Sequence, residues 1–264
     1  MLRRGRAASS GGGGGGWTPL FDTLRDFNSG TVGVAANAGG DGFDDIAGGS
    51  LYDTTHVYEG AKSCKMTIYS GTYGYGTWGG AINFPVNVGI GYRVWVQNYI
   101  YMPSSFEITT PGNGSLKYIR VRQKNISGAN GYNAGFFDAQ FKDDAETSSE
   151  FRMIKEGQDW WQEFGADGVF PRDEFVRHTI CIDLDTLGAN EAGNARVRFW
   201  QNAALLTDNG NIRTLINSTD YADALYLFSY WNGAAPKDQS LWIDALRVAA
   251  GTGTPSWAAD LEGV

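Results

Sequence analysis

The sequence is poor in cysteine, histidine and charge, and each shortage excludes a class of protein. Its 264 residues include two cysteines and two histidines, too few for a disulfide framework and too scattered for a zinc site. Charged residues make up 19% of the chain and the net charge is −8, whereas binding to nucleic-acid phosphates needs an excess of lysine and arginine. We therefore expect neither a zinc cofactor nor a nucleic-acid partner.

Long apolar runs are missing as well. No stretch of 18 apolar residues occurs, so we expect no membrane-spanning helix. The first six residues are basic, but residues 7–10 lead directly into six glycines, where a signal peptide would have its apolar segment. A standard secretion signal is therefore not expected.

Glycine and aromatic residues are abundant, with 37 glycines and 14% Phe, Trp and Tyr. This composition is typical of a turn-rich β protein. Residues 1–16 stand apart as an arm that carries Arg3, Arg4 and Arg6 before the polyglycine run, and Trp17 marks where it meets the body. Polyglycine has no side chains to bury and forms a flexible tether. The arm is either a disordered tail or an attachment segment that docks into a larger assembly.

From residue 17 onward the pattern predicts short strands between turns rich in Gly, Asn, Asp and Pro. A short helix is predicted near residues 218–224. We find no internal repeat, and we expect residues 17–264 to form one all-β domain. The predicted strands span residues 31–35, 54–58, 63–69, 81–84, 92–102, 116–123, 135–141, 150–155, 174–183, 195–201, 225–230 and 241–248.

Alternation within these strands predicts which side chains share a face. In residues 92–101, one face is aliphatic and the other carries aromatic and planar polar groups, and Arg120 and Arg122 share a face of the strand 116–123. Rigid rings beside planar hydrogen-bond donors suit sugars, so we predict an outward glycan-binding surface. Its expected members are Trp95, Tyr99, Tyr101, Arg120 and Arg122.

A second candidate patch lies at the corner YWNGAAPKDQS. It would comprise Tyr230, Trp231, Lys237 and Gln239. The alternative is structural: Trp231 and Trp242 pack in the core, and Asp238 caps a turn.

Alternation also bears on the cysteines and on one histidine. Cys64 and His178 each alternate with aliphatic residues, so we predict a core thiol and a core histidine. Cys181 falls on the opposite face of its strand, and the sequence leaves open whether the two cysteines pair.

Four stretches together resemble the concanavalin A-like lectin/glucanase jelly roll, in the branch that includes several polysaccharide lyases. The similarity covers residues 17–248, and it implies an antiparallel jelly-roll β-sandwich of two sheets. The stretches are YEGAKSCKMT (58–67), FVRHTICIDLDT (175–186), ARVRFWQN (195–202) and YWNGAAPKDQSLWIDALRV (230–248).

The resemblance implies chemistry that the residues can be tested against. Retaining hydrolases on this fold use E-x-D-x-E or E-x-D-x-x-E, which pairs two carboxylates, and neither pattern occurs here. A lyase that acts on uronates needs a group to neutralise the carboxylate and groups to transfer protons. Lys117, Arg120, Arg122 and Tyr132 loosely resemble one such set. Alternation places Lys117 on the face opposite the arginines, which counts against a shared site.

A structural Ca²⁺ is a further possibility. Asp41, Asp44, Asp45 and Asp244 could supply oxygen ligands, although the segment does not match the EF-hand pattern and a Gly-Asp turn explains it equally well. We expect no other cofactor.

These observations favour a phage or phage-derived surface protein, such as a decoration, fibre or spike component. Its jelly roll would bind host polysaccharide, and its arm would dock on a capsid or tail protein at the virion surface. This hypothesis reconciles an extracellular sugar-binding fold with the missing secretion signal. One alternative is a polysaccharide lyase or depolymerase for uronate-containing glycans, and another is a structural virion protein without a ligand. Self-association is left open.

Overall fold

The computed structural model describes residues 16–37, 40–46, 48–72, 78–108, 116–124, 135–141, 150–156, 161–163, 168–210 and 212–261. The chain folds into strands joined by turns, with two short 3₁₀ helices among these residues, η1 (Ala189–Glu191) and η2 (Ser256–Leu261). The strands are β1 (Thr18–Arg25), β2 (Asp45–Ile46), β3 (Ser50–Asp53), β4 (Ser63–Ile68), β5 (Gly80–Val88), β6 (Arg93–Tyr101), β7 (Leu116–Lys124), β8 (Gly135–Phe141), β9 (Glu150–Glu156), β10 (Trp161–Glu163), β11 (Gly168–Val169), β12 (Phe175–Asp183), β13 (Arg196–Gln201), β14 (Ala204–Asn209), β15 (Tyr221–Trp231) and β16 (Gln239–Thr252).

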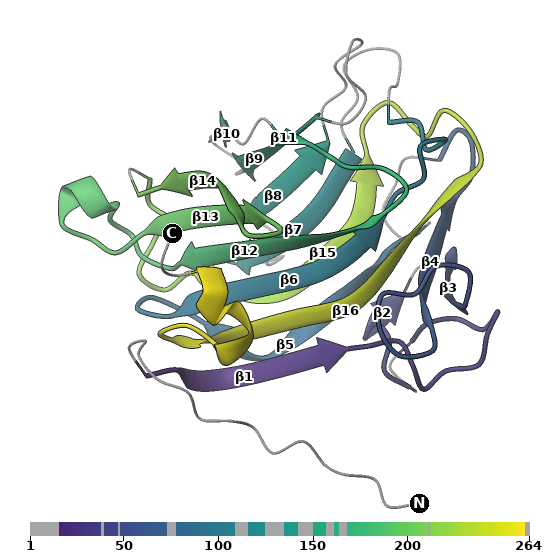
Figure 1. Ribbon diagram of the computed structural model, residues 1–264. Helices are drawn as coiled ribbons and strands as arrows, with labels where there is room; N and C mark the ends of the chain where they lie inside the picture. The colour runs from purple at the N-terminus through teal and green to yellow at the C-terminus, as the bar shows by residue number, and fades with distance from the viewer. Residues whose placement is uncertain are drawn as a thin grey trace, which may run out of the picture.

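These strands form two antiparallel sheets of eight strands each. Sheet I has the order β14-β13-β12-β6-β16-β4-β3, with β1 paired to β16, and sheet II has the order β10-β9-β8-β7-β15-β5-β2, with β11 paired to β9. Figure 1 shows β6, β12 and β16 of sheet I crossing in front of β15 and β5 of sheet II. The predicted two-sheet antiparallel sandwich is confirmed.

The main core fills the space between the sheets. Side chains of β6 and β12 that alternate toward sheet II, such as Val96 and Ile180, pack with those of β7 and β15, such as Val121 and Leu225. Each is at most 1% exposed. Burial of such side chains stabilises the fold by roughly 1.5–3 kcal/mol apiece. Where their period of two is unbroken, it fixes the face that the neighbouring polar residues take.

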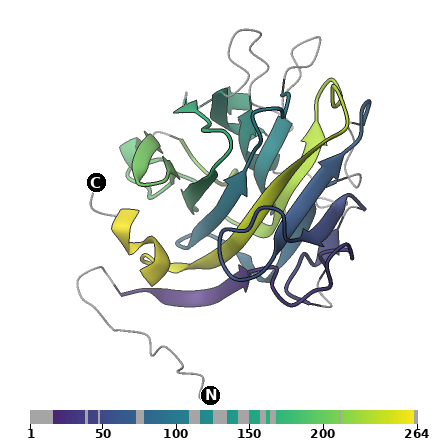
Figure 2. The same ribbon diagram turned by 45° about the vertical axis from the view of Figure 1, so that its right-hand side comes forward.

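A second apolar cluster, which we call the tryptophan cluster, lies on the outer face of sheet I. Trp95 and Trp200 stack there with ring centroids 5.9 Å apart, and η2 closes over them through Ala258 and Leu261. Figures 1 and 2 both show η2 lying beside the ends of β16 and β1. The Nε1–H of Trp257 donates to Asp22 (3.1 Å) and holds η2 on β1. The chain therefore buries Trp95 and Trp200 on this face with its own C-terminal segment.

Some sequence predictions about elements are wrong. Residues 31–35 and 54–58 form turns and bends, whereas β1 and β3 were not predicted. Residues 218–224 do not form a helix, because Asp220 accepts hydrogen bonds from the backbone N–H groups of Ile216 and Asn217, and strand β15 begins at the next residue. The carboxylate thus closes a turn that alternation alone could not reveal.

Both cysteines are buried and free. Cys64 lies in the core, as predicted, while Cys181 lies in the tryptophan cluster on the outer face of sheet I. They face opposite sides of one sheet, which keeps them from pairing. Within the described ranges, no helix is long and apolar enough to span a membrane.

Candidate functional site

A bulge in β7 brings Lys117 to the same face as the two arginines. Leu116, Tyr118 and Ile119 all belong to the core, and the pairing of β7 with β8 shifts register between Lys117 and Ile119. Two consecutive core residues, Tyr118 and Ile119, take up the extra position. The prediction that Lys117 faces away from Arg120 and Arg122 is therefore wrong.

A matching irregularity lies in the neighbouring strand β15. Its pairing with β7 shifts between Leu227 and Tyr230, and Leu227 and Phe228 both belong to the core. Phe228 adopts a positive φ of 48°, a conformation that a bulky residue takes only under local constraint. Tyr226 and Tyr230 both stand on the outer face of sheet II, where they pair across to Arg120 and Lys117 of β7.

Five side chains thus gather on the outer face of sheet II: Lys117, Arg120, Arg122, Tyr226 and Tyr230, which we call the sheet II cluster. The Lys117 Nζ lies 5.2 Å from the ring centroid of Tyr230, and the Arg122 guanidinium lies 5.2 Å from that of Tyr226. Lys117 and Arg122 therefore each sit against the ring of a tyrosine on the next strand, an arrangement that orders both partners.

Arg122 is the most tightly held member. Its Nε and a terminal nitrogen donate to the two carboxylate oxygens of Asp223 at 2.6 and 2.7 Å, and its other terminal nitrogen donates to the Tyr226 hydroxyl at 2.5 Å. Lys124 also pairs with Asp223 at 2.8 Å. A bidentate pair fixes the guanidinium plane, so Arg122 and Asp223 position the Tyr226 hydroxyl on this face.

The cluster combines positive charge with phenols. Lys117 and Arg120 are only 6% and 9% exposed, so both cations are held in place by their surroundings. Among the described side chains of β7 and β15 on this face, four cations accompany the single carboxylate of Asp223. Such a face can bind an anionic ligand and place hydroxyl groups beside it.

The sequence did not identify Tyr226 as a site residue. Its position between the apolar residues Leu225 and Leu227 was a usable signal that it faces outward, but Arg122 becomes its partner only through the pairing of β15 with β7. Tyr132, the remaining lyase candidate, falls outside the described residues.

The predicted single glycan surface is not formed. Trp95, Tyr99 and Tyr101 lie on β6 of sheet I, whereas Arg120 and Arg122 lie on β7 of sheet II. The outer faces of the two sheets point to opposite sides of the sandwich, so these residues cannot contact one ligand together.

Each of the three β6 residues instead contacts other parts of the chain on sheet I. Trp95 is fully buried in the tryptophan cluster. Tyr99 stacks on Tyr58 at 3.6 Å, and burial raises its pKa above the usual range. Tyr101 stacks on His56 at 3.8 Å.

The corner patch of residues 230–239 also divides between faces. Trp231 is fully buried beside Trp78, as the structural alternative predicted, so it cannot bind glycan. Lys237 pairs with Glu107 at 2.5 Å, and Gln239 bonds the backbone of Glu107 through both its amide oxygen and its nitrogen. These contacts tie two loops together.

The structural alternative for the corner patch is confirmed for Asp238, whereas its prediction of a core position for Trp242 is wrong. Asp238 accepts from the backbone N–H of Ser70 at 2.8 Å and fastens a turn. Trp242 alternates with core residues Leu241 and Ile243 and therefore faces outward from sheet I. Its Nε1–H donates to Asp53 at 2.8 Å.

His178 lies in the core as predicted. It is fully buried between the Tyr118 hydroxyl (3.2 Å) and the Gln201 amide oxygen (3.1 Å), and burial lowers its pKa to about 4. The ring is therefore neutral near pH 7 and serves as a structural link between β12, β7 and β13.

The aspartates considered for Ca²⁺ are spread over separate contacts. Asp41 accepts from the backbone N–H of Ser29 at 2.8 Å, and Asp44 pairs with Arg25 at 2.7 Å. Asp244 accepts from three backbone N–H groups, those of Tyr58, Glu59 and Ala245. Within the described ranges, no three potential ligand side chains come together, and these contacts fit the turn interpretation.

The proposed attachment arm is only partly in view. Arg3, Arg4 and Arg6 lie outside the described residues. Trp17 packs against the tryptophan cluster of its own chain, so this residue belongs to the folded body. Docking of the arm on a virion stays a prediction.

No protein-family model matches the sequence, and no curated protein matches it. Solved structures do match in fold. An endo-β-1,4-glucuronan lyase from Trichoderma reesei is similar at a TM-score of 0.60 and 12% identity, with 92% of this chain and 98% of that chain covered. A variant of the alginate lyase Aly36B in complex with an alginate trisaccharide is similar at a TM-score of 0.62 and 12% identity, over 86% and 97% of the two chains.

The alginate lyase vAL-1 from Chlorella virus is similar at a TM-score of 0.57 and 13% identity, with 83% of this chain and 99% of that chain covered. These neighbours are polysaccharide lyases that act on uronate polymers. The chain described here therefore has the jelly-roll fold that these polysaccharide lyases share.

Proposed function

We propose that this protein binds a uronate-containing polysaccharide on the outer face of sheet II and cleaves it by β-elimination. The observation that carries the proposal is the convergence of Lys117, Arg120, Tyr226 and Tyr230 on that face, to which the bulge in β7 turns Lys117. The lyase fold of the similar structures supports it.

The chemistry has three requirements, and the cluster offers a group for each. Positive charge beside the substrate carboxylate, from Arg120, stabilises the carbanion character that develops at C5. A base removes the C5 proton, the bond between C4 and the glycosidic oxygen breaks, and a C4=C5 double bond forms. An acid returns a proton to the leaving oxygen. We assign these proton transfers to Tyr230 and Lys117, whose Nζ lies 5.2 Å from the Tyr230 ring centroid, and Tyr226 provides a second phenol.

Arg122 has a different role in this scheme. Its guanidinium is committed to Asp223 and to the Tyr226 hydroxyl. We therefore assign it as a positioning residue for Tyr226. Carboxylate binding is assigned to Arg120, which lies across from Tyr226 in the pairing of β7 with β15.

The test is to incubate the protein with glucuronan and with alginate and to follow the absorbance of the unsaturated uronate product. Lys117→Met and Tyr230→Phe should each lower the rate roughly 10²–10⁴-fold, the usual contribution of a proton-transfer group. Arg120→Ala should lower it roughly 10²–10³-fold.

The fold offers matched controls on sheet I. Lys65 lies over the ring of Trp242 at 5.6 Å, as Lys117 lies over Tyr230, so Lys65→Met should leave the rate unchanged. Tyr101→Phe is the control for Tyr230→Phe. Binding of polymer without any rise in absorbance would refute cleavage and leave a polysaccharide-binding protein.

A further inference from the structure

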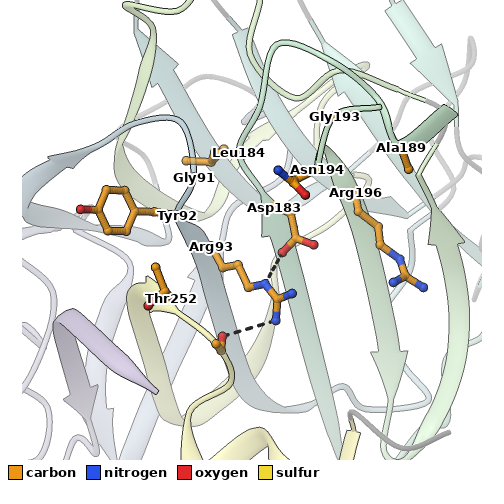
Figure 3. Close-up of a pocket in the computed structure, with 11 residues that line it drawn as sticks. Gly91, Tyr92, Arg93, Asp183, Leu184, Ala189, Gly193, Asn194, Arg196 and Thr252 are labelled. Atoms are coloured by element: carbon orange, nitrogen blue, oxygen red, sulfur yellow. Dashed lines mark hydrogen bonds and ion pairs between the residues drawn. The ribbon is translucent and has the colours of Figure 1, made fainter. Parts of the chain in front are cut away.

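A polar pocket of about 480 Å³ opens at one end of sheet I. It lies where β6 and β13 begin and β12 and β16 end, and Figure 3 shows its side chains projecting from these elements. All of its lining residues belong to sheet I or its connections, so the pocket is separate from the sheet II cluster.

An ion pair forms the floor of the pocket. The Arg93 Nε contacts the Asp183 carboxylate at 2.7 Å, as Figure 3 shows, and a terminal nitrogen of the same guanidinium donates to the backbone carbonyl of Gly253 at 3.5 Å. Arg198 approaches the same carboxylate at 3.3 Å, and its guanidinium lies 5.6 Å from the rings of both Trp95 and Trp200. The tryptophan cluster thus fixes the floor from below.

The rim is equally well ordered. Asp185 accepts backbone hydrogen bonds from Thr186 at 2.7 Å and from Asn194 at 2.8 Å, which sets the loop that carries the Asn194 side chain into the lining. Arg196 makes a bidentate pair with Asp208. That pair uses two of the five N–H donors of a guanidinium, and the Arg196 side chain also lines the pocket.

The donors and the shape of the pocket select the ligand. Arg93, Arg196 and Arg198 stand in and under the pocket with Asp183, Asp185 and Asp208, so these charges balance and the choice of ligand rests on the hydrogen-bond donors. Arginine and asparagine donors suit a carboxylate. The carboxylate of Asp183 repels a bare anion but accepts from hydroxyl groups. A volume of this size lies in the usual range for small-molecule sites.

We propose that this pocket is a second saccharide site, which binds a single sugar unit that bears a carboxylate. Arg196 and Asn194 contact the carboxylate, while Asp183 and Arg93 contact hydroxyl groups. Gly91 leaves the entrance open, since a β-carbon built there would meet no atom within 4 Å. The source of this sugar, the polymer cleaved on sheet II, rests on the proposed function. The chemistry of the pocket does not depend on it.

The test is a titration of ¹⁵N-labelled protein with a uronate disaccharide, a neutral disaccharide and acetate. We expect saturable shifts of the Gly91, Asn194 and Gly253 amide signals with the uronate disaccharide alone. A double variant, Asn194→Ala with Arg196→Gln, should bind at least tenfold more weakly. Arg247→Gln is the control, because Arg247 forms a comparable exposed pair with Asp22 (2.8 Å) away from the pocket.

Several outcomes would overturn the inference. These are unshifted pocket amides, equal shifts with acetate or the neutral sugar, or undiminished binding by the double variant. Failure of the proposed function looks different. In that case the amides of β7 and β15 stay unshifted and no unsaturated product forms, while the pocket amides still respond.

Discussion

Two buried groups should give the folded protein opposite responses to acid. His178 has its pKa lowered by burial from 6.5 to about 4, so the unfolded chain binds more protons between these values. Stability supplied by the neutral ring is present above pH 6.5 and is lost as the pH falls toward 4. At about 1.4 kcal/mol for each pH unit, the loss is about 3 kcal/mol.

Asp244 acts in the opposite direction. It is fully buried, and burial raises its pKa from 3.8 to about 6 in spite of the three backbone N–H groups that it accepts from. The folded state therefore binds more protons between these values, and stability rises by about 3 kcal/mol as the pH falls through this window. The two contributions nearly cancel in the parent protein.

Single variants separate the two effects. Urea unfolding followed by tryptophan fluorescence, at about pH 7 and about pH 4, gives the change in unfolding free energy with acid. Relative to the parent, His178→Gln should gain about 3 kcal/mol on acidification and Asp244→Asn should lose about 3 kcal/mol. The double variant should change with pH as the parent does. If His178→Gln and the parent show the same pH dependence, the burial argument fails.

Other predictions address packing and backbone. Trp95→Ala should destabilise the fold by roughly 3–5 kcal/mol in urea unfolding while leaving the rate per folded molecule unchanged; a selective loss of activity would contradict its assignment to the tryptophan cluster. Gly79 has a φ of +80° and its β-carbon would meet the Leu227 carbonyl oxygen at 2.1 Å. Gly79→Ala should therefore cost more than about 1 kcal/mol and disturb the bulge of β15; an unchanged unfolding free energy would refute this.

The sequence predicts the sandwich well because alternation is a local property. In β6 and β12 every aliphatic residue assigned to the core, such as Val96 and Ile180, is found there. The same reasoning identifies His178 as a core residue, since it shares the period of its aliphatic neighbours.

The candidate site is harder to predict, because it depends on departures from that period. Alternation predicts that Lys117 and Arg120 lie on different faces of β7. Only the bulge at Tyr118 and Ile119 brings them to the same face. Alternation also correctly turns Trp95 away from the core. It cannot reveal that η2, more than 160 residues later in the chain, returns to cover that ring.

The bulge in β7 has a consequence for how the strand is held in register. Tyr118, one of its two consecutive core residues, donates through its hydroxyl to Asn98 of β6 at 2.7 Å and contacts His178 of β12. A shift of β7 by one position would break the contacts of this hydroxyl with sheet I and would turn Lys117 toward the core. Tyr118 therefore both forms part of the bulge and holds β7, which carries the cations, in register with sheet I.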